Sequence, residues 1–210
     1  MNKPLYKICG INNQKILDYL ISSESNANFL GFIFYENSPR NVNNDFLRTI
    51  NKTDFKDKKP VCVYVNASEE FVRKTSSYFK NPLLQFHGDE TNTFCKLFKK
   101  EFWKVIRFKD VNCLDKIHMY PDASGILLEN YQKGVHGGTG KSFNWQLIPK
   151  KVLKEHKIIL SGGINSKNVD NAIGIDPWCI DINSGVESKK GVKEIKLIKE
   201  IFKNFNNENK

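Results

Sequence analysis

The stretch LLQFHGDETNTFCKLFKKEFWKVIRF, residues 83–108, contains two short apolar runs with a more polar segment between them. Leu83–His87 and Phe102–Phe108 predict buried strands, because each run is rich in aromatic and aliphatic residues. Asp89 predicts the N-cap of a helix in the segment that separates them. A strand, a helix and a second strand in this order predict two parallel strands joined by a right-handed crossover.

The same alternation repeats along the chain at intervals of very roughly 25 residues. The predicted strands are Leu5–Cys9, Phe29–Tyr35, Val61–Asn66, Leu83–His87, Phe102–Phe108, Gly125–Asn130, Lys157–Ser161 and Trp178–Ser184. Ser68 is predicted to cap one helix, and either Asn165 or Ser166 another. Eight such units favour a compact α/β fold, a (β/α)8 TIM barrel in a single domain over residues 1–205 with a polar tail at 206–210. A doubly wound open sheet is the alternative architecture.

Length and composition exclude several classes of protein. The chain has 210 residues, 40% of them hydrophobic, which is enough for one domain with a packed core. Because no apolar run approaches the ~20 residues of a membrane span and no signal peptide is seen, we expect a cytoplasmic protein with no membrane partner. The five cysteines are odd in number and scattered, which argues against a disulfide scaffold and against a metal site.

The formal net charge of +10 comes from 33 Lys and Arg against 23 Asp and Glu, so it favours anionic partners. The lysines are spread along the chain and no nucleic-acid-binding motif accompanies them. We therefore interpret most of them as a solvated surface and expect no nucleic-acid partner. A small anionic substrate is compatible with the same charge.

Polar residues stand near the C-terminal ends of the predicted strands, where a buried parallel strand should be apolar. Three pairs consist of residues i and i+2, which share a strand face: Lys7 with Cys9, Gln85 with His87, and Asp181 with Asn183. Arg107 and Glu129 stand singly near the ends of two further strands. Taken alone, each one is more typical of a strand end that reaches solvent, and His87 is equally typical of a structural histidine. Together they predict an active site, because ligands of α/β sheets bind beyond the carboxyl ends of the strands.

Glycine-rich loops follow the last two predicted strands. SGGIN at 161–165 and NSGVE at 183–187 each end a strand before a helical segment, the usual place of a phosphate site in a barrel. A third segment, GVHGGTGKS at 134–142, is not a P-loop, since the position of the first required glycine is Val135. We interpret it as an active-site loop. The expected phosphate-binding residues are Gly138, Gly162, Gly163, Asn165, Ser184 and Gly185.

In their order along nearly the whole chain, the motifs resemble phosphoribosylanthranilate isomerase, a barrel enzyme of tryptophan biosynthesis. The matching segments are KICG at 7–10, GFIFY at 31–35, SPR at 38–40, LQFHGDE at 84–90, GGTGK at 137–141, FNW at 143–145, SGGIN at 161–165 and DINSGVE at 181–187. This resemblance implies an Amadori rearrangement of N-(5-phosphoribosyl)anthranilate, which needs no cofactor. It also implies a small phosphosugar as the partner, and a monomer is the default expectation for so small a barrel.

The resemblance assigns Cys9 as the general base and Glu129 as the general acid. It assigns Arg40 to the anthranilate carboxylate, a role suited to a guanidinium fork, and Asp181 to the substrate hydroxyls. The other polar strand-end residues are expected to contact the substrate as well: Lys7, Gln85, His87 and Arg107.

One position departs from the family pattern. The sixth strand of the family ends in Leu-Leu-Asp, whereas this chain has Leu127-Leu128-Glu129, so the acid is one methylene longer. For Glu129 to act as an acid, burial should raise its pKa. Two alternatives stay open: the related aminoaldose isomerase of histidine biosynthesis, whose first strand carries Asp where Cys9 stands, and a non-catalytic basic barrel that lost its activity through Glu129.

Overall fold

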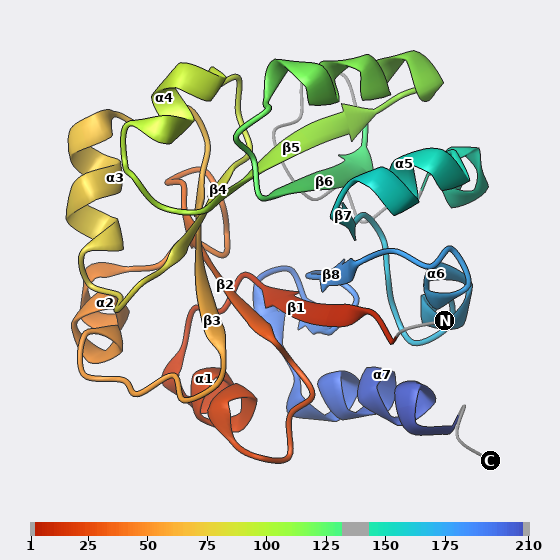
Figure 1. Ribbon diagram of the computed structural model, residues 1–210. Helices are drawn as coiled ribbons and strands as arrows, with labels where there is room; N and C mark the ends of the chain where they lie inside the picture. Colours follow the sequence, from red (N-terminus) through yellow and green to blue (C-terminus); the bar gives the residue numbers. More distant parts are fainter. Residues whose placement is uncertain (1–2, 132–142, 208–210) are drawn as a thin grey trace.

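A computed structural model describes residues 3–131 and 143–207, and eight parallel strands form a closed barrel in sequence order (Figure 1). The strands are β1 (Leu5–Cys9), β2 (Phe29–Phe34), β3 (Lys59–Tyr64), β4 (Leu83–Phe86), β5 (Phe102–Phe108), β6 (Gly125–Asn130), β7 (Ile158–Leu160) and β8 (Cys179–Ile182). Because β8 pairs with β1, the sheet has no edge strands, and the doubly wound alternative is wrong. The predicted (β/α)8 barrel is confirmed.

A helical segment follows each barrel strand and covers the outside of the barrel (Figure 1). The helices are α1 (Gln14–Ile21), α2 (Asn44–Ile50), α3 (Glu69–Ser76), α4 (Asn92–Lys96), the 3-10 helices η1 (Val111–Met119) and η2 (Trp145–Leu147), α5 (Lys150–Glu155), α6 (Val169–Ile173) and α7 (Ile195–Asn207). The last helix contacts α6, and its Phe202 ring lies 6.2 Å from the ring of Tyr6 on β1. It thereby packs beside the first strand. Helix α7 extends over residues 206 and 207, the first two of the expected polar tail.

Two predicted helix caps are wrong. Asp89 does not cap α4, because the loop continues past it and the cap is Thr91, whose hydroxyl accepts from the Phe94 N–H. The backbone N–H of Asp89 donates to the Asn66 side chain. The Asn165 side chain accepts instead from the backbone N–H of Lys167 within the preceding turn, so neither it nor Ser166 caps α6, which begins after Asn168. The cap at Ser68 is confirmed.

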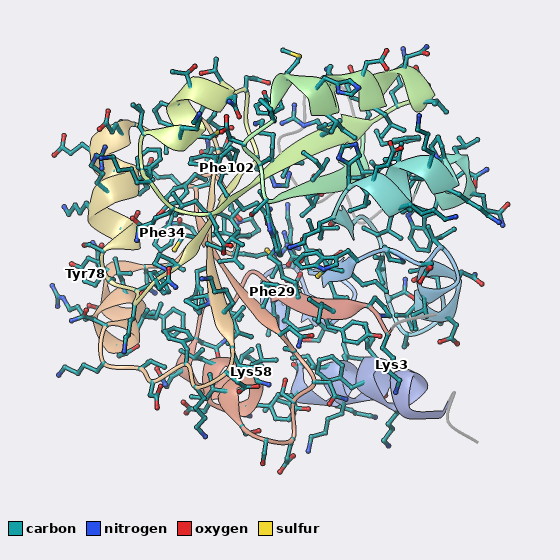
Figure 2. All side chains as sticks on the ribbon, viewed as in Figure 1. Lys3, Phe29, Phe34, Lys58, Tyr78 and Phe102 are labelled. Atoms are coloured by element: carbon teal, nitrogen blue, oxygen red, sulfur yellow. The ribbon has the colours of Figure 1, made fainter. Side chains whose placement is uncertain are left out.

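The apolar core has two layers. One fills the inside of the barrel and the other lies between the strands and the helices. Phe29, labelled near the centre of Figure 2, lies 4.8 Å from Trp103 and 5.6 Å from Trp178, measured between ring centroids. Since Phe29 begins β2, Trp103 is the second residue of β5 and Trp178 precedes β8, aromatic side chains close the N-terminal end of the barrel. The predicted polar site residues lie toward the opposite end, formed by the C-terminal ends of the strands.

The strand register aligns these polar residues across neighbouring strands. Lys7 of β1 is the register partner of Asp181 of β8, and Arg107 of β5 is the partner of Glu129 of β6. Cys9 stands beside Gly31 of β2. Because all eight strands are parallel, their carboxyl ends meet at one mouth, and the predicted site residues gather there.

A short antiparallel hairpin, β9 (Glu187–Lys189) and β10 (Val192–Lys193), follows β8 and lies outside the repeating pattern. The sequence analysis does not predict it. Its turn residue Gly191 has a φ of +84°, and a Cβ there would come 2.7 Å from the carbonyl oxygen of Pro39. The hairpin is therefore packed against the loop that follows β2. Within the described residues, no helix has both the length and the apolar character needed to cross a membrane.

Candidate active site

Cys9, Lys7 and Asp181 form a buried cluster at the mouth of the barrel. The Lys7 ammonium donates to Asp181 Oδ1 at 3.0 Å, and neither side chain is exposed by more than 5%. Burial raises the pKa of the Cys9 thiol, while the charge of Lys7 acts in the opposite direction. Gly31 leaves room for this cluster, since a Cβ at that position would lie 2.8 Å from Cys9 Sγ. The arrangement supplies a thiol next to a permanent cation.

Glu129 and His87 form a second cluster across the mouth. Oε2 of Glu129 lies 2.6 Å from Nε2 of His87, and the two side chains are only 9% and 12% exposed. The Gln85 amide nitrogen stands 3.4 Å from the other ring nitrogen of His87, and Arg107 donates to the His87 backbone carbonyl at 3.2 Å. Three predicted residues, from β4, from the loop after it and from β5, are therefore brought together beside the Glu129 carboxyl group of β6.

A buried ion pair holds the loop that carries His87. The Lys104 ammonium donates to the carbonyls of Phe86 and Gly88 and, at 2.9 Å, to Oε2 of Glu90. Oε1 of Glu90 accepts from the backbone N–H of Asn66 at 2.7 Å. Lys104 and Glu90 are both buried, and the sequence analysis did not select either. Their bonds tie the loop after β4 to Lys104 within β5 and to the loop that follows β3.

Arg40 meets Glu187 of the β9–β10 hairpin in a two-pronged ion pair. Its Nε donates to Oε1 at 2.7 Å and its Nη2 to Oε2 at 2.8 Å. Lys193 also donates to Oε1 of Glu187, at 3.0 Å. Burial opposes the charge of Glu187, but the hydrogen bonds from Arg40 and the charge of Lys193 prevail and lower its pKa to about 2. In the sequence, Glu187 ends the DINSGVE motif with no sign of its role, and no pattern indicates Lys193.

The low pKa of Glu187 predicts a specific pH dependence of stability. Because the folded-state pKa of about 2 lies below the ordinary value of 4.5, ionised Glu187 stabilises the fold above pH 4.5. This contribution is lost as the pH falls from 4.5 through about 2. Glu187→Gln should thus lower the free energy of unfolding at neutral pH, and its difference from wild type should narrow steadily below pH 4.5. Urea titrations across this range measure both quantities.

Glu194→Gln is the matched control for this titration, because Glu194 is an exposed carboxylate at the end of the same hairpin, bonded to Ser188. We expect it to differ little from wild type at any pH. If the difference in unfolding free energy between Glu187→Gln and wild type stayed constant down to about pH 3, the charge of Glu187 would not stabilise the fold.

The two described glycine loops lie side by side. Asn165 and Gly185 form a bridge, and a Cβ on Gly185 would overlap the carbonyl oxygen of Ile164. Gly162 and Gly163 have φ values of +99° and +68°, which only glycine adopts readily. The Asn165 amide donates to the Gly163 carbonyl, so this side chain shapes the loop. The predicted residues of these two adjoining loops are Gly162, Gly163, Asn165, Ser184 and Gly185.

The predicted active-site loop at 134–142, with Gly138 and His136, lies outside the described residues. Over the ranges 3–131 and 143–207, no group of three His, Cys, Asp or Glu side chains could hold a metal ion.

Comparison with known proteins points to one family. A family model described as N-(5'-phosphoribosyl)anthranilate (PRA) isomerase matches residues 6–204. The isomerase of that name from Trichlorobacter lovleyi is 38% identical over 200 residues, which cover 94% of this chain and 96% of the relative.

Solved structures agree. Phosphoribosylanthranilate isomerase from Thermotoga maritima has a TM-score of 0.82 at 31% identity, with 97% of this chain and 99% of that chain covered. A structure of the isomerase in complex with reduced 1-(o-carboxyphenylamino)-1-deoxyribulose 5-phosphate has a TM-score of 0.81 at 30% identity and the same coverage.

Proposed function

The chain belongs to the N-(5'-phosphoribosyl)anthranilate isomerase family, and from this premise we propose how its barrel mouth carries out the Amadori rearrangement of tryptophan biosynthesis. The substrate is an aminoaldose that carries a phosphate and an aromatic carboxylate, and the product is the corresponding 1-deoxyribulose 5-phosphate derivative. One observation carries the assignment of roles: Cys9 and Glu129 stand at the carboxyl ends of strands of one closed parallel barrel, and Arg40 packs against Gly10, the residue after Cys9, where a Cβ would lie 2.8 Å from Arg40 Cδ. A thiol, a carboxyl group and an anion-binding cation thus face one small volume.

Glu129 is proposed to act first, as the general acid. Its proton goes to the furanose ring oxygen, the bond between that oxygen and C1' breaks, and C1' becomes doubly bonded to the anthranilate nitrogen. Glu129 is left as a carboxylate. His87, 2.6 Å from Oε2, orients the carboxyl group before the transfer and can donate to the carboxylate after it.

Cys9 is proposed to act second, as the general base. Its thiolate takes the proton from C2', and the electrons of that bond form the C1'–C2' double bond of an enolamine. A proton then returns to C1' while the C2' hydroxyl loses one, which gives the ketone. Lys7 supports this step because its ammonium stabilises the thiolate more than the thiol.

The remaining residues are proposed to bind the substrate. Arg40 receives the anthranilate carboxylate, and Asp181, held by Lys7, accepts hydrogen bonds from substrate hydroxyls. Gln85 and Arg107 contribute to substrate binding by holding His87 in place beside Glu129. The phosphate binds at the adjoining loops of Gly162, Gly163, Asn165, Ser184 and Gly185, with Gly138 as a further contact.

We propose that the enzyme works as a monomer, the default for so small a barrel, in the cytoplasm, where its substrate would be made.

Arg40→Lys tests the carboxylate contact. A lysine keeps the positive charge but cannot offer two parallel N–H groups to a carboxylate. We expect the KM for the substrate to rise about tenfold or more, with a smaller change in kcat, since the charge-assisted bonds are made to the bound substrate throughout the reaction. Steady-state kinetics measures the two constants.

Arg48→Lys is the control, because Arg48 is exposed on α2 and pairs only with Asp45 in the described structure. Equal KM values for Arg40→Lys and wild type would remove Arg40 from the carboxylate site.

Complementation tests the proposed function as a whole. We expect the gene to restore growth without tryptophan to a bacterial strain that lacks this isomerase, and the Cys9→Ser variant to fail. A strain that lacks the aminoaldose isomerase of histidine biosynthesis should not be rescued. Rescue of the histidine strain alone would favour the related family, and rescue of neither strain by a stably expressed protein would favour a barrel without this chemistry.

A further inference from the structure

The β9–β10 hairpin is an addition to the barrel, and two of its buried residues reach a proposed substrate-binding side chain. Glu187 binds Arg40 through both carboxylate oxygens, at 2.7 and 2.8 Å. The side chains of Arg40 and Glu187 are 7% and 3% exposed, and that of Lys193 is fully buried. Such a pair is more than a surface ion pair, because solvent does not screen it and both prongs have good geometry.

A continuous set of bonds links Arg40 to the end of strand β8. The Lys193 ammonium donates to Glu187 Oε1, to the Asn183 carbonyl and to Asn183 Oδ1, each at 3.0 Å. On the other side, a Cβ on Gly10 would come 2.8 Å from Arg40 Cδ and 2.9 Å from Asn183 Oδ1. Glu187, Lys193 and Asn183 are called the Arg40 clamp below. Glu187 binds one edge of the Arg40 guanidinium and is itself held by Lys193, while Gly10 packs against the aliphatic part of the Arg40 side chain.

The clamp also belongs to a larger set of buried charges. Arg40, Lys7 and Lys193 are cations, and Asp181 and Glu187 are carboxylates, all of them buried in the described structure. The set has one more positive charge than negative charges. A single additional anion, either the Cys9 thiolate or a substrate carboxylate, would balance it, and such an anion gains most where water is excluded.

We propose that Glu187 and Lys193 are positioning residues, which orient the Arg40 guanidinium so that it receives the aromatic carboxylate of the substrate. The proposal rests on the proposed function, in which Arg40 binds that carboxylate. A long arginine side chain loses conformational entropy when it is ordered. If the clamp orders Arg40 before the substrate binds, this entropy loss does not reduce the binding free energy of the substrate.

Two explanations of the clamp predict different outcomes for Glu187→Gln. If the clamp acted only through charge, removal of a carboxylate beside Arg40 would strengthen binding of the substrate anion. If it acts by positioning, binding weakens, because the amide nitrogen of glutamine would face an Arg40 N–H donor and the two-pronged pair could not form. Lys193→Met removes a cation and weakens binding under both explanations. The glutamine variant is therefore the decisive one.

The experiment measures dissociation constants of two probes for the full-length protein. One is reduced 1-(2-carboxyphenylamino)-1-deoxyribulose 5-phosphate, and the other is the same compound without the carboxylate. For Glu187→Gln and for Lys193→Met we expect about tenfold weaker binding of the carboxylated probe, the size of one lost charge-assisted contact, and less than about twofold change for the other probe. The probe without the carboxylate also reports that the variant is folded.

The double variant Glu187→Gln, Lys193→Met restores the wild-type net charge and removes both buried charges together, which reduces the risk of unfolding. Positioning predicts that it binds the carboxylated probe as weakly as the single variants, whereas a charge-only role predicts near wild-type affinity. Glu194→Gln and Lys190→Met, exposed residues next to the clamp, are the controls and should bind both probes like wild type.

Unchanged or tighter binding of the carboxylated probe by Glu187→Gln would overturn the proposal, and so would an equal loss for both probes. Failure of the wild type to bind either probe would instead overturn the proposed function, and the role of the clamp with it.

Discussion

Replacement of Cys9 by serine is expected to lower kcat by about a thousandfold, within the range that general-base catalysis contributes. Serine is nearly the same size, so it can occupy the space that Gly31 leaves and should not disturb the barrel. Its hydroxyl is far less acidic than a thiol, and even beside Lys7 it would hold almost no oxyanion at neutral pH. KM should change little, since the proposed carboxylate and phosphate contacts are untouched.

Cys113→Ser is the matched control. Cys113 lies on η1, is partly exposed and belongs to none of the site clusters described above, so its kinetics should equal those of the wild type. Retention of more than about a tenth of the wild-type kcat by Cys9→Ser would show that another group removes the C2' proton.

Replacement of Glu129 by glutamine should have a comparably large effect. Glutamine keeps the length of the side chain and can still accept from His87, but its amide cannot protonate the ring oxygen. We expect kcat to fall by about a hundredfold to ten-thousandfold with KM nearly unchanged. The pH profile of the residual activity should also lack the limb that reports titration of the acid.

Glu129→Asp is the informative companion. Aspartate is the family residue at this position, but in this chain it would withdraw the carboxyl group from His87, and a displacement of ~1 Å can cost ~100-fold. The aspartate variant should therefore stay below wild type and above Glu129→Gln. Glu155→Gln, an exposed position on α5, serves as the control. If Glu129→Gln retained wild-type kcat and its full pH profile, the general acid would lie elsewhere.

The fold could be predicted from the sequence because its signal is local and repeated. The predicted bounds of β1, β5 and β6 agree with the structure residue for residue. Buried parallel strands are short, apolar and followed by polar residues, so their ends are easily seen. The right-handed crossover then leaves a small number of arrangements, of which the closed barrel is the one found.

The partners of the site residues could be predicted only in part. Strand register, which follows from the barrel, pairs Lys7 with Asp181. The contact of Arg40 with Glu187 joins residues 147 positions apart, one in a loop and the other at the start of the short strand β9, and no periodicity specifies it. The hairpin of β9 and β10 was missed because its residues are mostly polar and its strands are only three and two residues long.

The glutamate at position 129 acquires a physical explanation from the structure. The sequence shows only that the side chain is one methylene longer than the family residue. In the structure its carboxyl group meets His87 at 2.6 Å, and Gln85 and Arg107 hold that histidine from two other sides. The longer acid thus has a defined position at the mouth of the barrel, which favours retained chemistry over a decayed site.

The most direct test of the central claim is a steady-state assay of the purified wild-type protein with freshly generated N-(5'-phosphoribosyl)anthranilate, in which the loss of anthranilate-type fluorescence is followed. The chain with Glu129 as its acid should convert the substrate with a kcat of the ordinary enzymatic order, about 1 per second or more. If the wild type is inactive while Glu129→Asp turns over, the barrel is an isomerase scaffold whose acid has lost its function.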